Sequence, residues 1–322
     1  MSRPDDSFLN PDQLANVHRH ADRLLREAAA CGRFPTPIDD IMAAAKLTVV
    51  DDEILNDTFL RRFLAKARAG IATIKSALSK VLGLFEANDR LVVIDKDVPS
   101  PRIPFVKLHE AGHGTMPHQS KVYALIHDCE KTLDPDITDL FEREANVFAS
   151  EAMFQGDIFA QQAHDKEFGI KTAMGLAKQF GGSNYATFRR YVTTNPRACC
   201  LVVLEPVLTD GRGDFKADVR RVVASKTFDK IYDAAKLGHT VTGQHPLSTL
   251  VPRGKNQRMV YPRGIGLVDR NGEPRECIGE AFNTKHQILI LIRDERPLNT
   301  TTIVLPRTAE FERLAGKLFR RT

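Results

Sequence analysis

One short segment of this chain has two histidines four residues apart, with a glutamate directly after the first. This spacing indicates a helix. The segment is His109-Glu110-Ala111-Gly112-His113. Residues i and i+4 of an α-helix lie one above the other, so a helix places both imidazoles on one face. Two rings in that arrangement can bind a single zinc ion, as in H-E-x-x-H sites. The segment therefore predicts a helix over residues 105–117 that carries a candidate zinc site.

A catalytic zinc ion usually has a third protein ligand, and the residues that follow the motif offer few candidates. The metzincin continuation needs glycine at position 116 and histidine at position 119, where this chain has Met116 and Gln119. His118 misses that spacing, and we interpret it as a surface residue or as a residue that supports a ligand. His127 has no partner at helical spacing and is interpreted as structural or exposed.

The next predicted helix along the chain offers two glutamates, Glu142 and Glu144. Two residues span about 200° of helix, so both side chains cannot point at one metal. Glu142 shares a face with small apolar residues and Asn146, and such a face can pack closely. Glu144 lines up with Glu151 and Gln155 on a face that we expect to be solvated. We therefore predict Glu142 as the third ligand, with Asn146 orienting Glu142 or a histidine from behind.

Glu110 is the predicted catalytic base. A glutamate next to the first histidine of such a motif projects toward the water that the metal makes more acidic, and it can take a proton from that water. The water then attacks a peptide carbonyl, and Glu110 passes the proton to the leaving amine. Tyr123, His118 and His127 are candidates for the group that stabilises the oxyanion.

Three segments together resemble the ImmA/IrrE family of zinc metallopeptidases. They are residues 90–95 (RLVVID), residues 105–113 (FVKLHEAGH) and residues 142–149 (EREANVFA). The resemblance covers roughly residues 10–192. It implies the same ligand set, His109, His113 and Glu142 around Zn²⁺, with Glu110 as the base. It also implies a cytoplasmic protein that makes limited cuts in a helix-turn-helix repressor and so induces a stress or mobile-element response.

We predict an α+β fold in three parts. Residues 1–160 are expected to form a mostly helical, zincin-like metallopeptidase core with a small sheet, residues 161–197 a helical linker, and residues 198–322 an α/β domain. The hairpin over residues 173–192 resembles the helix-turn-helix-like segment of the family, and we expect it to pack on the peptidase and help form the substrate groove. The order of elements after it resembles the GAF-like sensor domain of longer members.

The individual elements follow from periodicity and capping residues. We expect helices over residues 11–31, 38–46, 59–82, 136–153, 170–180, 183–192, 227–237 and 308–321, and strands over residues 47–50, 90–95, 199–206, 217–225, 276–282, 287–294 and 301–306. The 59–82 segment has an a/d repeat and a basic face, which we expect to pack on its own domain, with a partner seam as the alternative. Residues 119–135 are ambiguous, and the basic segment 253–263 is expected to be a solvated loop.

Composition excludes several classes of protein. The hydrophobic share of 42% and the charged share of 27% are ordinary for a globular protein. The net charge of +5 is too small to argue for nucleic-acid binding. No apolar run approaches the ~18 residues of a membrane helix, and the start of the chain does not resemble a signal peptide. The five cysteines form no C-x-x-C pair, which favours the reducing cytoplasm; they are Cys31, Cys129, Cys199, Cys200 and Cys277.

Two other classes of function stay open. One is a regulatory protein whose zinc site is not catalytic, and the other is a protein that binds DNA directly through the 173–192 hairpin. We expect a protein substrate and no direct contact with nucleic acid or membrane. The sequence indicates neither an oligomeric state nor the signal that the C-terminal part would sense.

Overall fold

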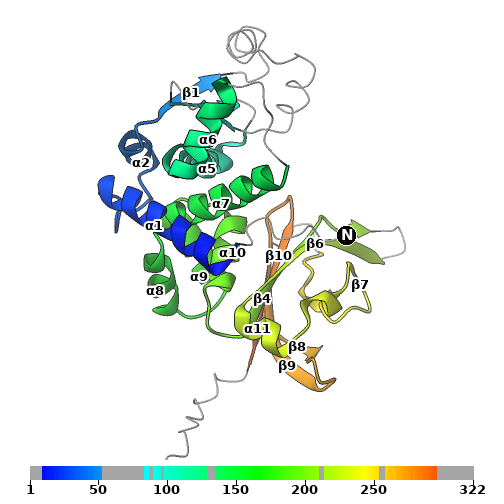
Figure 1. The fold of residues 1–322 in the computed structure, drawn as a ribbon. Coiled ribbons are helices and arrows are strands. Elements are labelled where there is room, and N and C mark those ends of the chain that lie inside the picture. The colour runs from blue at the N-terminus through cyan, green and yellow to red at the C-terminus, as the bar shows by residue number, and fades with distance from the viewer. Residues whose placement is uncertain are drawn as a thin grey trace, which may run out of the picture.

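The computed structural model describes residues 9–52, 83–86, 90–95, 98–128, 135–209, 214–253 and 258–295. These residues form an α+β fold (Figure 1). The first half holds α1 (Pro11–Glu27), α2 (Ile38–Ala44), β1 (Thr48–Asp52), β2 (Gly83–Glu86), β3 (Leu91–Asp95), η1 (Ser100–Arg102), α5 (Ile103–Thr115), α6 (Pro117–Asp128), α7 (Pro135–Phe154), α8 (Asp157–His164), α9 (Ile170–Phe180) and α10 (Asn184–Thr193). The predicted elements at 59–82, 301–306 and 308–321 lie outside the described residues.

The second half is mainly strands. It holds β4 (Cys199–Leu204), β5 (Leu208–Thr209), β6 (Phe215–Ala224), α11 (Lys226–Ile231), η2 (Ala234–Leu237), β7 (Thr240–Thr242), η3 (Ser248–Leu250), β8 (Met259–Val268), β9 (Pro274–Asn283) and β10 (Ile288–Asp294). Two predictions were wrong here. The helix expected over 227–237 is split into α11 and η2, and the loop expected over 253–263 becomes a strand from Met259 onward.

Capping residues explain where α1 and α10 begin. The side chain of Asn10 accepts a hydrogen bond from the backbone of Gln13 at 2.9 Å, and the Gln13 side chain accepts one from Asn10 at 3.0 Å, which closes a capping box. Ser183 caps α10 by accepting from the Ala186 backbone. The first helix ends at Glu27 rather than at residue 31, because Ala29 has a φ of 47° and so leaves the helical conformation.

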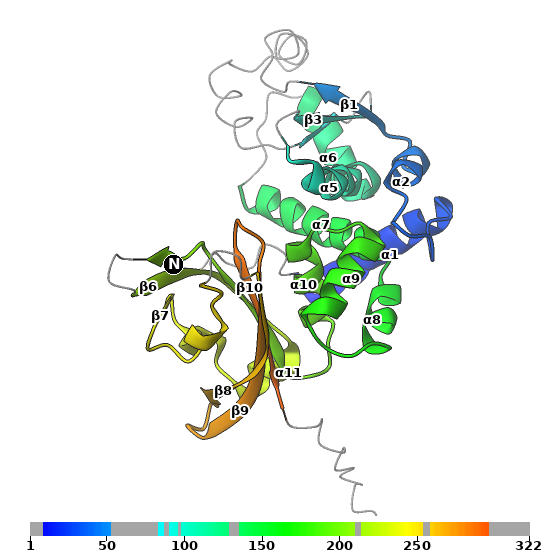
Figure 2. The same ribbon diagram turned by 180° about the vertical axis from the view of Figure 1, so that it is seen from behind.

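Helix α7 occupies the centre of the helical half. In Figures 1 and 2 it lies between α5 on one side and α10 on the other, with α1 alongside. Beyond α5 lies a three-stranded sheet in which β3 pairs in parallel with β1 and antiparallel with β2. The buried residues of these elements form one apolar core that fixes α5 against α7.

The close packing of α5 on α7 depends on a glycine in the histidine motif. A Cβ built on Gly112 would lie 3.2 Å from a ring carbon of Phe148 and 3.3 Å from the Cα of Ala145, so the two helices approach where a side chain would separate them. His109 and His113, which flank Gly112 on α5, are thereby brought within reach of α7.

Replacing Gly112 with alanine should therefore destabilise the protein. Phe148 and Ala145 are fully buried, so the helices must move apart to accept the methyl group, at a cost of about 1 kcal/mol or more. The matched control is Gly175→Ala on α9, where nothing lies within 4 Å of the added Cβ and the change should stabilise by about 0.5–1 kcal/mol. Urea denaturation measures both. Equal stabilisation by the two substitutions would contradict the close approach.

The large sheet is formed by strands of the second half, and one of its faces packs against helices of the first half. Its strand order is β5-β6-β4-β10-β9-β8, all neighbours are antiparallel, and β7 pairs with β6. Alternate residues of β4 point to opposite faces. Leu201 belongs to the core shared with the helices, whereas Val202 belongs to a second core on the far face. The predicted boundary at 197/198 thus falls between α10 and β4, at a packed contact; that the parts are separate domains stays a prediction.

Within the described residues, no helix is both long enough and apolar enough to cross a membrane.

Candidate metal centre

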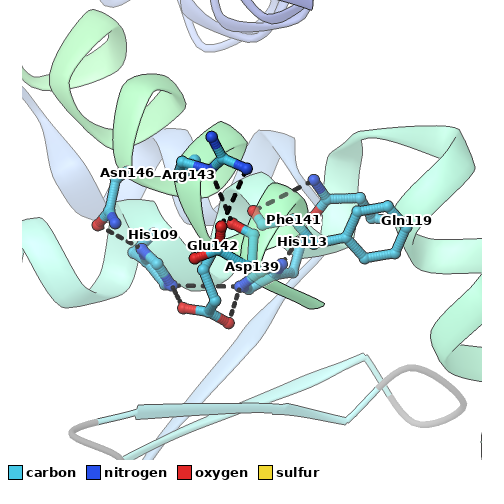
Figure 3. A network of polar contacts seen from close by, with 8 residues as sticks. All are labelled: His109, His113, Gln119, Asp139, Phe141, Glu142, Arg143 and Asn146. Carbon is cyan, nitrogen blue, oxygen red and sulfur yellow. Dashed lines mark hydrogen bonds and ion pairs between the residues drawn. The ribbon is translucent and has the colours of Figure 1, made fainter. Parts of the chain in front are cut away.

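Three side chains from α5 and α7 converge on one point (Figure 3). The Nε2 atoms of His109 and His113 lie 3.2 Å apart. The Glu142 carboxylate faces both rings, with 3.2 Å from Oε2 to His109 Nε2 and 3.5 Å from Oε1 to His113 Nε2. One ligand atom from each residue lies within 4.8 Å of the others, so the group can hold a metal ion. The structure thus brings together the three residues predicted as ligands.

Amide oxygens hold the outer nitrogens of both imidazoles. Asn146 Oδ1 lies 3.2 Å from Nδ1 of His109, and Gln119 Oε1 lies 2.6 Å from Nδ1 of His113. The Gln119 amide is oriented because its nitrogen donates to the carboxylate of Glu144 at 2.6 Å. An amide oxygen can only accept, so each Nδ1 carries the proton and each Nε2 directs a lone pair inward.

This arrangement fits a tetrahedral zinc ion. Two nitrogens bound to one zinc at about 2.0–2.1 Å stand about 3.3 Å apart, close to the separation of the two Nε2 atoms here. Two lone pairs aimed at each other repel unless a cation or a proton lies between them. The donor set, two imidazoles and one carboxylate, is also the set found in many catalytic zinc sites.

The charges around the three ligands favour a cation. Desolvation alone would raise the pKa of Glu142, but an imidazole that takes up a second proton, on Nε2, donates it to the carboxylate, and these hydrogen bonds from the two histidines hold that pKa well below its usual range. Burial opposes protonation of His109, yet the hydrogen bond to Glu142 and the nearby carboxylates raise its pKa above the ordinary value. The centre is thus a cluster that already attracts positive charge.

Glu110 lies next to the ligands but is enclosed by protein. Its side chain is buried, and burial raises its pKa, while the two histidines and a backbone hydrogen bond from Phe85 oppose the shift. A carboxyl group with a raised pKa takes up and returns a proton more readily near neutral pH than an exposed one. The location and protonation behaviour of Glu110 therefore suit the role of a general base.

A buried chain of polar side chains supports His113 from behind, and no pattern in the sequence indicated it. Gln119 joins His113 to Glu144, and the same Glu144 oxygen binds Nε2 of His118 at 2.6 Å. Gln119 has no exposed surface and Glu144 is 4% exposed. His118, interpreted as a surface or supporting residue, is partly exposed at the outer end of the chain. The side chain of His127 lies outside the described residues.

The predicted solvated face of α7 is wrong. Glu144, Glu151 and Gln155 are all buried, because α7 is covered by other elements on both sides and each of these polar groups has a partner. Glu151 forms an ion pair with Arg190 and contacts His18 at 3.3 Å, and Gln155 binds the backbone of Gly32 and Arg33. Glu142, in contrast, is half exposed because it faces the opening of the site.

The Glu151 ion pair predicts a specific loss of stability in acid. The pKa of the Glu151 carboxyl is lowered from 4.5 to about 2. Desolvation by burial would raise this pKa, but hydrogen bonds and positive charge from His18 and Arg190 outweigh that effect. The ionised form therefore stabilises the fold above about pH 4.5, and this contribution of roughly 3 kcal/mol is lost as the pH falls toward 2. Glu151→Gln should be less stable than the wild type at pH 6 and equally stable near pH 2, measured by urea denaturation.

The control for this prediction is Glu205→Gln, which removes an exposed pair with Arg220 whose closest atoms are 3.8 Å apart. Such a pair contributes little, so its effect should be small at both pH values. A pH-independent effect of Glu151→Gln would show that the side chain stabilises α7 by packing rather than by charge.

The metal centre opens into a cleft of about 950 Å³. Its walls come from α5, α7, α10 and the first residue of α11, Lys226, and Phe85 and Tyr123 border the metal end. The ring of Tyr123 lies 5.3 Å from that of His113, and burial raises its pKa above the ordinary value, so its hydroxyl keeps its proton. Of the candidates for an oxyanion donor, Tyr123 lines this cleft and His118 does not, while the side chain of His127 lies outside the described residues.

Comparison with known proteins adds little. No protein-family model and no curated protein matches the chain. One similar solved structure is a Mycobacterium tuberculosis transcriptional regulator, which is 14% identical, covers 91% of this chain and 96% of its own, and has a TM-score of 0.49. A likeness at this level assigns no function, so the geometry of the centre is the basis for one.

Proposed function

We propose that this chain is a zinc-dependent endopeptidase built on a zincin-like core. The observation that supports this most is the convergence of His109, His113 and Glu142, with both Nδ1 atoms held by amides and the buried Glu110 beside them. A structural zinc site is usually closed by four protein ligands, whereas a group of three leaves a position open. All three residues line the cleft, so a metal held by them would be accessible to a substrate.

In the proposed reaction, the residues of the chain position the substrate and move one proton. A zinc ion held by the three ligands would polarise the peptide carbonyl and make water more acidic. Glu110 takes the proton from the attacking water and delivers it to the leaving nitrogen. Tyr123 keeps its hydroxyl proton and can donate a hydrogen bond to the developing oxyanion.

The substrate we propose is a helix-turn-helix repressor in the cytoplasm, cut at one or two places. The warrant is the family resemblance of the three sequence segments. The cleft is consistent with it, because one wall is α10 from the hairpin, so access to the metal is narrowed by an element outside the α5–α7 pair.

Direct DNA binding by the hairpin is less well supported. Arg190, one of its two arginines, makes two contacts to the Glu151 carboxylate and one to the backbone of Gly156, and its side chain is 12% exposed. To bind a DNA phosphate, Arg190 would have to give up its contacts to Glu151 and Gly156. The other arginine, Arg189, faces the cleft rather than an open convex surface.

The test of the proposed function is co-expression with a candidate repressor, for which a repressor encoded beside this gene is the first choice. A discrete repressor fragment should appear with the wild-type chain and should disappear when zinc is removed from the purified pair by a chelator and return when zinc is added back. Intact repressor under all metal conditions would count against this substrate. Efficient digestion of unfolded casein would instead indicate a broad peptidase.

A further inference from the structure

The cleft continues well past the metal centre along α7. Helices α5 and α7 run antiparallel, because His113 is linked through Gln119 to Phe141 and Glu144 while His109, earlier on α5, contacts Asn146, later on α7. The start of α5 therefore lies beside the second half of α7. Phe105 of α5 and Ser150 and Glu151 of α7 line the same cleft, together with Pro101 and Arg102 of η1 just before α5.

We call the part of the cleft beside Glu151 the distal end; Arg190 pairs with Glu151 there, and Arg102 comes just before the start of α5. Five basic side chains line the cleft, namely Arg102, Arg189, Arg190, Arg221 and Lys226. They come from η1, α10, β6 and α11, so four elements supply them. Glu151 and Asp157 are the acids that line the cleft at this end, and Glu151 is held by Arg190. Arg102 and Lys226 are exposed to the opening.

The distance between the two ends sets a register for a bound peptide. Glu142 and Glu151 are nine residues apart on one helix, and at 1.5 Å per residue this is about 13 Å. An extended peptide advances about 3.3 Å per residue, so the distal end lies about four residues away from a peptide bond held at the metal. Resting on the proposed function, we infer that the distal end binds an acidic side chain of the substrate three to five residues from the cleaved bond.

A polypeptide fits this charge pattern better than a nucleic acid does. The metal end presents the carboxylates of Glu110 and Glu142, whereas Arg190 and Arg102 lie toward the distal end. A nucleic-acid strand carries a negative charge at every step and would meet carboxylates at the metal end. A peptide with one acidic side chain at the right distance meets positive charge only where its own negative charge lies.

The test uses peptides whose register is fixed. In a set of eleven-residue peptides, a central phosphinate replaces the cleaved bond and binds zinc, and a single aspartate is moved through the other positions of an otherwise neutral sequence. Affinity for the zinc-loaded full chain is measured by fluorescence anisotropy. Aspartate three to five residues from the phosphinate, on one side, should bind about tenfold more tightly than glutamine there, and the gain should shrink as salt is raised.

Charge reversal at two of the basic residues that line the cleft checks the assignment. Lys226→Glu should abolish the gain from aspartate and make lysine the better residue at that position, whereas the matched control Lys230→Glu, on the same helix but outside the cleft lining, should change nothing. Arg102→Glu, from the other wall, should act like Lys226→Glu.

Three results would overturn the inference, and they are distinguishable. Equal affinity for all phosphinates, the neutral one included, would leave the metal centre intact and remove the distal site. Failure of every phosphinate to bind would count against the proposed function as well. Displacement of the aspartate peptide by a 20-base-pair DNA duplex, with the same sensitivity to Lys226→Glu, would assign the distal end to nucleic acid instead.

Discussion

The Glu110→Gln variant should bind zinc as the wild-type chain does and cleave its substrate 10²–10⁴-fold more slowly, which is the usual contribution of a general base. Glutamine keeps the size of the side chain and can still accept the backbone hydrogen bond from Phe85, but it cannot take a proton. Because Glu110 is buried with a raised pKa, the neutral amide also introduces no desolvation penalty. Initial rates on the repressor, together with zinc content, measure both effects.

Either of two outcomes would revise the role of Glu110. Cleavage at the wild-type rate would mean that another group takes the proton. Loss of zinc together with loss of cleavage would mean that the charge of Glu110 supports the metal rather than the chemistry. A surface control, Glu167→Gln, should change neither the zinc content nor the rate, since this exposed side chain lies outside the cleft lining.

The parts of the fold that rest on local signals could be predicted from the sequence. Asn10 and Ser183 mark helix starts, and residues 91–94 of β3 form a continuous apolar run. The glycine in the histidine motif permits close packing because it has no side chain, and Phe148 and Ala145 lie against it. Each of these features is decided within a few residues or by the size of one side chain, so tertiary context does not alter it.

The burial of polar residues on α7 could not be predicted in the same way. Hydrophobic periodicity assumes one apolar face and one solvated face, but α7 packs against both α5 and α1, and Arg190 of α10 also reaches it. A helix enclosed in this way can bury acids wherever another element supplies a partner, as His118 and Gln119 do for Glu144 and Arg190 does for Glu151. These partners lie 25 to 39 residues away in the sequence, and no local rule connects them.

The angle between Glu142 and Glu144 around the helix axis nevertheless allows only one of the two side chains to face the metal position. It depends only on helix geometry, which separates the two residues by about 200° regardless of what surrounds the helix. The structure brings Glu142 to the two histidines and turns Glu144 to the opposite side of His113, where it acts through Gln119. The prediction that Glu144 is solvated was wrong, because Glu144 is buried. Only Glu142 of the two faces the histidines, as predicted.

That difference predicts how the two glutamates behave when each is removed. His109→Ala, His113→Ala and Glu142→Ala should each lose most of the zinc, because each removes one of three ligands. Glu142→Ala is the cleanest of them, since its side chain is half exposed and its loss should cost little stability. Glu144→Ala should keep zinc but bind it about 10–100-fold more weakly, as expected when a group that orients a ligand is lost. Zinc content after dialysis and a chelator titration measure these effects.

The comparison of Glu142→Ala with Glu144→Ala is the decisive test of the ligand assignment. Both variants replace a glutamate with alanine, and the two positions are only two residues apart on the same helix. If Glu144→Ala loses zinc outright while Glu142→Ala retains it, the ligand assignment is reversed. If both variants retain zinc, the two histidines alone hold the ion and the carboxylate is not needed.

Glu144→Gln separates the charge of Glu144 from its hydrogen bonds. An amide oxygen can still accept from Gln119 and His118, so this variant should recover part of the zinc affinity lost in Glu144→Ala. Recovery would show that Glu144 acts through the orientation of Gln119 and His113, and no recovery would show that its charge is what the metal requires.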